Sequence, residues 1–188
     1  MGLDMYLNRK KYVGAEYEHR GVTGKVEIKI NGKKLPIDFN KISYIEESVC
    51  YWRKANAIHK WFVDNVQDGV DDCRNAYVNL ADLEKLLNVC KEVKKIAKMK
   101  KGKVECGKEL KDGQWVPIIK DGEYIENREE IEKILPTSSG FFFGSTDYDE
   151  WYMQDIDFTI EKLENIIKEE KEMNKLGFYS DFEYRSSW

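Results

Sequence analysis

The chain contains few of the residue types and patterns that mark catalytic centres or metal sites. It has two histidines, His19 and His59, and its four cysteines show neither a CxxC pair nor the spacing of metal ligands. The motifs GxSxG, HExxH and GxGxxG and the P-loop are all absent. We therefore expect no catalytic residue, no metal ligand and no bound cofactor.

Long apolar runs and a basic charge balance are also missing. No apolar stretch approaches the ~20 residues of a membrane-spanning helix, and no secretory apolar segment opens the chain. The formal net charge is −4, whereas general nucleic-acid binders are usually basic. We therefore expect a soluble cytoplasmic protein that has neither a membrane nor nucleic acid as its partner.

Aromatic residues are abundant at 13%, beside 35% charged residues, a composition typical of a compact core under a well-solvated surface. Apolar and polar residues alternate with a period of two at 3–8 and again at 178–188, which predicts strands at both ends of the chain. We expect the last strand to lie beside the first. Asn31-Gly32 predicts a hairpin between two further strands at 26–30 and 33–39.

Three main helices are predicted between these strands. The first runs from about Ser48 to just before Asp68, and the second follows Asn79, which is a suitable N-cap. The third is a long helix that ends at Gly177, a residue type common just beyond helix ends. A short helical segment at 127–135 precedes it.

Two other segments complete the expected architecture. The sequence predicts a short buried strand at 140–144. It also predicts an insertion of one or two hairpins at 100–126. The expected fold class is α+β, with a small antiparallel or mixed sheet packed against about three helices. We expect a single domain over residues 1–188, with both termini in strands.

The segment Tyr51–Val63 is the most informative part of the chain. At ~100° per residue of a helix, Trp52 and His59 fall on one line, and Asn56 lies beside it. A buried imidazole or carboxamide without a hydrogen bond costs about 1–3 kcal/mol. The partner of each group is therefore either the protein itself or a bound molecule.

Two interpretations of this segment stay open. In a ligand site, Trp52 would stack, Asn56 would bond a base or an amide, His59 would orient or neutralise charge, and Arg53 would clamp a phosphate or carboxylate. In a purely structural role, the same tryptophan would be core, the imidazole would bond a backbone carbonyl and the guanidinium would be solvated. The predicted ligand-binding residues are therefore Trp52, Arg53, Asn56 and His59.

A second candidate lies at the turn 141–151, before the third helix. Free N–H groups at a helix start can bind an anion. Asp147, Asp149 and Glu150 would repel a phosphate there. We therefore favour simple capping of the helix by its own carboxylates.

The opening Met1-Gly-Leu-Asp-Met-Tyr-Leu7, taken with Tyr51-Trp-Arg-Lys-Ala-Asn-Ala-Ile-His-Lys-Trp-Phe62 and Gln67-Asp-Gly69, resembles a family of small uncharacterised proteins of tailed bacteriophages and their bacterial hosts. The resemblance covers about the first 70 residues. It implies an accessory phage protein that acts in the bacterial host cytoplasm, and it carries no catalytic role. It marks as positions of interest Tyr51, Trp52, Arg53, Asn56, His59 and Trp61.

Three functions follow from these observations. The leading one is a phage-type accessory protein that binds a small anionic or nucleotide-like ligand, with interference with a host defence as the implied role. The alternative is a non-enzymatic interaction factor that docks on a host protein through residues 100–126 or the acidic stretch 147–173. The third is a hydrolase that uses His59. Assembly into a homo-oligomer is compatible with each of them.

Overall fold

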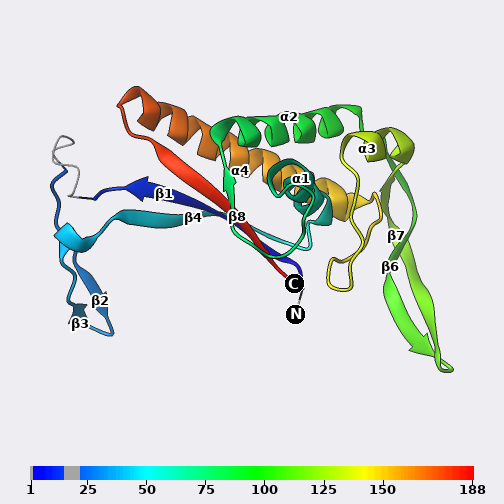
Figure 1. The fold of residues 1–188 in the computed structure, drawn as a ribbon. Helices are drawn as coiled ribbons and strands as arrows, with labels where there is room; N and C mark the ends of the chain where they lie inside the picture. Colours follow the sequence, from blue (N-terminus) through cyan, green and yellow to red (C-terminus); the bar gives the residue numbers. More distant parts are fainter. Residues whose placement is uncertain (1, 15–21) are drawn as a thin grey trace.

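The computed structural model describes residues 2–14 and 22–188, and His19 lies outside this part of the chain. Within it, the chain forms an α+β fold (Figure 1). The elements in chain order are β1 (Asp4–Tyr12), β2 (Ile28–Ile30), β3 (Lys33–Leu35), the 3-10 helix η2 (Phe39–Lys41), β4 (Tyr44–Arg53), α1 (Asn56–Val66), β5 (Ala76–Val78), α2 (Leu80–Ile96), β6 (Met99–Lys111), β7 (Gln114–Ile125), α3 (Arg128–Ile134), α4 (Glu150–Lys175) and β8 (Ser180–Ser187).

The central sheet has the strand order β4-β1-β8-β5, and every neighbouring pair is antiparallel. The first and last strands of the chain lie side by side, as their alternation predicts. Met5, Leu7 and Phe182 are buried on the face that α1, α2 and α4 cover (Figure 1). The opposite face carries exposed aromatic residues, among them Tyr51 and Tyr77.

Several predicted turns and caps are confirmed. Asn31 and Gly32 join β2 to β3 and both have a positive φ, as a tight hairpin turn requires. Asn79 caps α2 in a capping box. The long helix α4 ends before Gly177, whose φ of +81° allows the chain to leave the helix.

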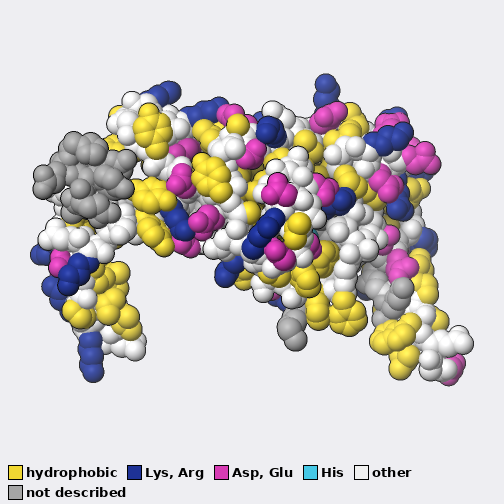
Figure 2. All heavy atoms as spheres, in the orientation of Figure 1, with side chains coloured by type: hydrophobic (Ala, Val, Ile, Leu, Met, Phe, Trp, Pro, Cys, Tyr) yellow, Lys and Arg dark blue, Asp and Glu magenta, His cyan; other side chains and the backbone are white. Residues whose placement is uncertain are grey.

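The insertion predicted at 100–126, of one or two hairpins, is a single hairpin. Strands β6 and β7 pair from Met99 opposite Ile125 to Lys111 opposite Gln114. This hairpin and the smaller β2–β3 hairpin project from the body at opposite ends of the molecule (Figures 1 and 2). The body between them holds the sheet and its covering helices.

The first helix begins later than the sequence pattern predicts. It starts at Asn56, and Ser48, the predicted cap, lies inside β4. Residues 44–53 pair with β1 along their whole length and are rich in β-branched and aromatic residues, which favour a strand. Main-chain pairing with β1 therefore overrides the helical spacing of the side chains. The prediction that Trp52 and Arg53 lie on a helix is wrong.

The strand predicted at 140–144 is not formed either. The N–H of Phe143 donates to the carbonyl of Gly140 in a turn (3.2 Å), and Gly144 has a φ of +87°. Phe141 is 94% exposed, whereas Phe143 is buried. One aromatic ring, not a continuous apolar run, therefore anchors this segment, and the two glycines let the backbone bend around it.

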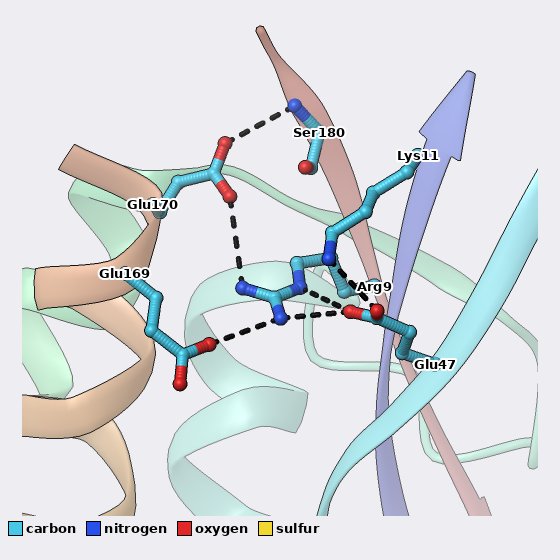
Figure 3. A network of polar contacts seen from close by, with 6 residues as sticks. All are labelled: Arg9, Lys11, Glu47, Glu169, Glu170 and Ser180. Atoms are coloured by element: carbon cyan, nitrogen blue, oxygen red, sulfur yellow. Dashed lines mark hydrogen bonds and ion pairs between the residues drawn. The ribbon is translucent and has the colours of Figure 1, made fainter. Parts of the chain in front are cut away.

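An ion network with a buried centre joins α4 to the sheet (Figure 3). Arg9 of β1 is buried, and its guanidinium donates to Glu47 of β4 (2.8 Å) and to Glu169 of α4 (3.0 Å). Glu170, also buried, lies 4.0 Å from the same guanidinium and accepts a hydrogen bond from the backbone N–H of Ser180 (3.1 Å). Lys11 also pairs with Glu47 (2.8 Å), so two cations of β1 face three carboxylates from two elements.

Replacing Arg9 by methionine should destabilise the fold by about 3–5 kcal/mol, because the buried Glu170 carboxylate then lacks a countercharge. The free energy of unfolding, measured by urea denaturation, gives the test. Lys103→Met is the matched control, since Lys103 pairs with Asp121 on an exposed hairpin, where such a pair is worth less than about 1 kcal/mol. Adding Glu170→Gln to Arg9→Met should recover part of the loss. Equal effects of Arg9→Met and Lys103→Met would contradict this account.

Candidate functional site

A cavity of about 340 Å³ lies where β4 turns into α1. Three segments contribute its lining: the corner at 53–58, the irregular segment at 137–147 and the first turns of α4 at 149–156. These segments are far apart in the sequence. The cavity therefore exists only in the folded chain, and its volume is within the range of about 300–1,000 Å³ typical of small-molecule sites.

Two unusual backbone conformations make the corner sharp. Lys54 has a φ of +61°, in the left-handed region that residues with side chains rarely adopt, and its N–H is fixed by the carbonyl of Leu3 (2.8 Å). Ala55 has φ −75° and ψ 67°, which is an inverse γ-turn, and the N–H of Asn56 donates to the Lys54 carbonyl (2.8 Å). The strand thus gives way to the helix within two residues. Arg53 and Lys54 both border the cavity as a result.

The start of α1 makes this side of the cavity electropositive. Ala55 occupies the N-cap position and has no acceptor atom in its side chain, and no side chain of the described residues caps the helix. The first three helical residues, 56–58, line the cavity. The positive end of the helix dipole and the cations of Arg53 and Lys54 therefore act on the same space. The guanidinium of Arg53 also lies 3.9 Å from the carboxylate of Asp4, outside the cavity.

The Asn56 side chain connects α1 to the irregular segment. Its amide nitrogen donates to the carbonyls of Phe143 (3.1 Å) and Ser145 (2.7 Å), and its oxygen accepts from the N–H of Ser138 (3.2 Å). This predicted site residue lines the cavity, but its carboxamide already has three backbone partners. Asn56 therefore shapes the cavity wall.

The opposite side of the cavity carries carboxylates. Asp149 is the N-cap of α4 and accepts from the N–H groups of Trp151 (3.0 Å) and Tyr152 (3.1 Å). Asp147 accepts from the Ser145 hydroxyl (2.6 Å). Both groups therefore have structural partners, as expected from simple capping of the helix.

Asp155 differs from these two carboxylates. It lines the cavity, and its carboxylate has no hydrogen-bond or ion-pair partner in the part of the chain that the structure describes. Burial and, to a lesser degree, the neighbouring Asp149 carboxylate raise the pKa of Asp155 to about 7. A raised pKa in a cavity is typical of functional carboxylates.

Trp151 supplies an aromatic surface at the cavity. Its side chain is 61% exposed, although tryptophan is usually well buried, and it lines the cavity from the first turn of α4. Asp155 follows it by four residues on the same helix, so the two side chains are neighbours on one helix face. This arrangement places an aromatic plane beside an unpartnered carboxylate.

Two of the predicted site residues lie elsewhere. Trp52 is 2% exposed, packs against Phe62 and donates from its indole N–H to Thr159 of α4 (2.9 Å). His59 is 1% exposed and makes hydrogen bonds with the Tyr184 hydroxyl (2.7 Å) and the Asp71 carboxylate (2.9 Å). Neither side chain lines the cavity, and every polar atom of both has a protein partner.

The cavity therefore brings together Arg53 and Asn56 from the predicted set with the turn 141–151, the second candidate, and adds Asp155, which the sequence analysis missed. One signal was available for Asp155: it follows Tyr152 by three residues and precedes Thr159 by four, so it lies on the apolar face of α4. A carboxylate on such a face needs an explanation. Comparison with protein-family models, curated proteins and solved structures gives no match.

Replacing Asn56 by alanine should destabilise the fold by about 2–3 kcal/mol, because three backbone groups of the segment 138–145 lose their partner. Amide hydrogen exchange should show lost protection at the N–H of Ser138. Asn65→Ala is the matched control on the same helix, since among the described residues the Asn65 side chain has one partner, the carbonyl of Trp61 (2.8 Å). Unchanged exchange at Ser138 in the Asn56 variant would contradict the assigned role.

Replacing Asp155 by asparagine should stabilise the protein at high pH. The folded-state pKa of about 7 lies above the ordinary value of 3.8, so between these pH values Asp155 is protonated in the folded state and ionised in the unfolded state. The folded protein therefore loses stability as pH rises from 3.8 to about 7. The gain in unfolding free energy over wild type should therefore be about 1–3 kcal/mol larger at pH 8 than at pH 5. Asp157→Asn, which breaks an exposed pair with Lys94, is the control. A pH-independent difference would refute the raised pKa.

Proposed function

We propose that this protein is a binding protein whose cavity at the β4–α1 corner takes a small anionic, nucleotide-like ligand. The observation that carries the proposal is the convergence of Arg53, Lys54 and the uncapped start of α1 on one cavity. Backbone N–H groups at a helix start and a guanidinium are both suited to phosphate or carboxylate. The exposed indole of Trp151 offers a base a stacking surface at the same cavity.

Sequestration of a ligand needs no chemical step, and the proposal includes none. The third function considered above, hydrolysis by His59, has less support. A general base must reach its substrate directly or through one water, and both ring nitrogens of His59 already contact protein groups in a buried position. We therefore place the ligand at the cavity, away from His59.

The biological setting of the proposal comes from the phage-type motifs in the first 70 residues. A phage accessory protein that removes a nucleotide-like signal would interfere with a host defence in the bacterial cytoplasm. None of the helices that the structure describes combines the length and apolar surface needed to cross a lipid bilayer. The cytoplasmic location and the host-defence role are part of the proposal.

Isothermal titration calorimetry with 5′-mononucleotides and inorganic phosphate tests the proposal. We expect at least one nucleotide to bind. We also expect Arg53→Ala to weaken that binding about tenfold or more, because one charge-assisted contact is lost. Arg185→Ala is the matched control, because Arg185 lies on the sheet and packs over the Tyr6 ring without lining the cavity. Absence of binding, or equal affinities of wild type and Arg53→Ala, would refute the proposal.

A second candidate function is docking on a host protein through the β6–β7 hairpin. This projecting hairpin exposes Leu110, Trp115 and Ile119, at 59%, 68% and 52%, and Figure 2 shows hydrophobic side chains gathered along it. Large apolar side chains on a projecting element are typical of interaction sites. Replacing Leu110, Trp115 and Ile119 by serine distinguishes the two candidates, because none of these side chains lines the cavity. Nucleotide affinity should be unchanged if the cavity is the site, whereas binding to the host protein should be lost if the hairpin is the site.

A further inference from the structure

We infer that the base of the ligand is guanine, and that Asp155 is the residue that selects it. This inference rests on the proposed function, since it names the nucleotide that the β4–α1 cavity would take. The carboxylate lines the cavity, is half-buried, and has no hydrogen-bond or ion-pair partner among the described residues. Its oxygens are therefore available to accept hydrogen bonds from a molecule that enters the cavity.

The geometry of α4 places this carboxylate at the edge of a stacked base. Trp151 and Asp155 are four residues apart, and side chains so spaced are neighbours on a helix surface, with about 5–6 Å between their Cβ atoms. Helical side chains also tilt toward the helix N-terminus, which directs Asp155 toward Trp151. A base lying on the indole would therefore present its edge, and not its face, to the carboxylate.

Guanine is the base whose edge fits a carboxylate best. An ionised carboxylate offers two adjacent acceptor oxygens. Guanine presents two adjacent donors, its N1–H and its 2-amino group, so both bonds form side by side, as in a bidentate pair. Adenine has an acceptor at N1 beside its amino group, and hypoxanthine lacks the 2-amino group, so each makes at most one of these bonds.

Other groups at the cavity agree with this assignment. Gln154, the residue before Asp155, also lines the cavity, and its amide can donate to the guanine carbonyl O6. Arg53 and Lys54 lie on the other side, where the nucleotide phosphate would be. Asp147 and Asp149 face the same space, but one oxygen of each accepts hydrogen bonds from Ser145 or from the start of α4, which leaves Asp155 as the carboxylate with both oxygens available.

The test compares GMP, IMP, XMP and AMP by isothermal titration calorimetry at pH 8, where the carboxylate is ionised. Wild type should bind GMP about 10- to 100-fold more tightly than IMP, which lacks only the 2-amino group. Asp155→Asn should reverse the preference from GMP to XMP, because an asparagine amide donates to the xanthine O2 and still accepts from N1–H. Asp157→Asn, on the same helix but outside the cavity, should keep the wild-type order.

The outcomes separate this inference from the proposed function. Equal affinities for GMP and IMP, or an Asp155→Asn variant with the wild-type preference, would overturn the guanine assignment while nucleotide binding itself stands. Failure of all four nucleotides to bind would overturn both. If Asp155 had a merely structural role, its replacement could change the affinity for all four ligands together. It would not reverse the preference from GMP to XMP.

Discussion

The cavity depends on the Asn56 carboxamide. The segment 137–147 forms no strand or helix. Three hydrogen bonds to this one side chain and the buried ring of Phe143 hold it against α1, and the N–H of Leu3 donates to the carbonyl of Phe142 (3.1 Å). Because the same residue begins α1, the helix start and the cavity wall are fixed together. A change at Asn56 would therefore alter the whole site and not one contact.

The two sides of the cavity have opposite electrostatic character, and this limits what can bind. The corner contributes cations and the uncapped helix start, whereas α4 contributes carboxylates and the exposed indole of Trp151. A purely anionic molecule would meet Asp155, and a purely cationic one would meet Arg53. A ligand with an anionic group at one end and N–H donors at the other satisfies both sides, and a nucleotide has this character.

The sequence predicts well those features that depend on neighbouring residues. Period-two alternation identifies the terminal strands, Asn31-Gly32 identifies a hairpin, and Asn79 identifies the start of α2. The β4–α1 corner could not be found in this way. Its strand is fixed by pairing with β1, more than 30 residues earlier, and the left-handed conformation of Lys54 has no signature in residue type. Helical spacing alone therefore placed Trp52 and Arg53 on the wrong element.

The most direct test of the central claim, that the corner cavity binds a nucleotide-like anion, is an NMR titration of ¹⁵N-labelled protein with GMP. The account predicts that the backbone amide signals of Ala57 and Ile58 and the indole signal of Trp151 shift together and saturate with one affinity, while the buried indole of Trp52 is unaffected. Shifts confined to the β6–β7 hairpin or to the residues around His59, or no shifts at all, would contradict it.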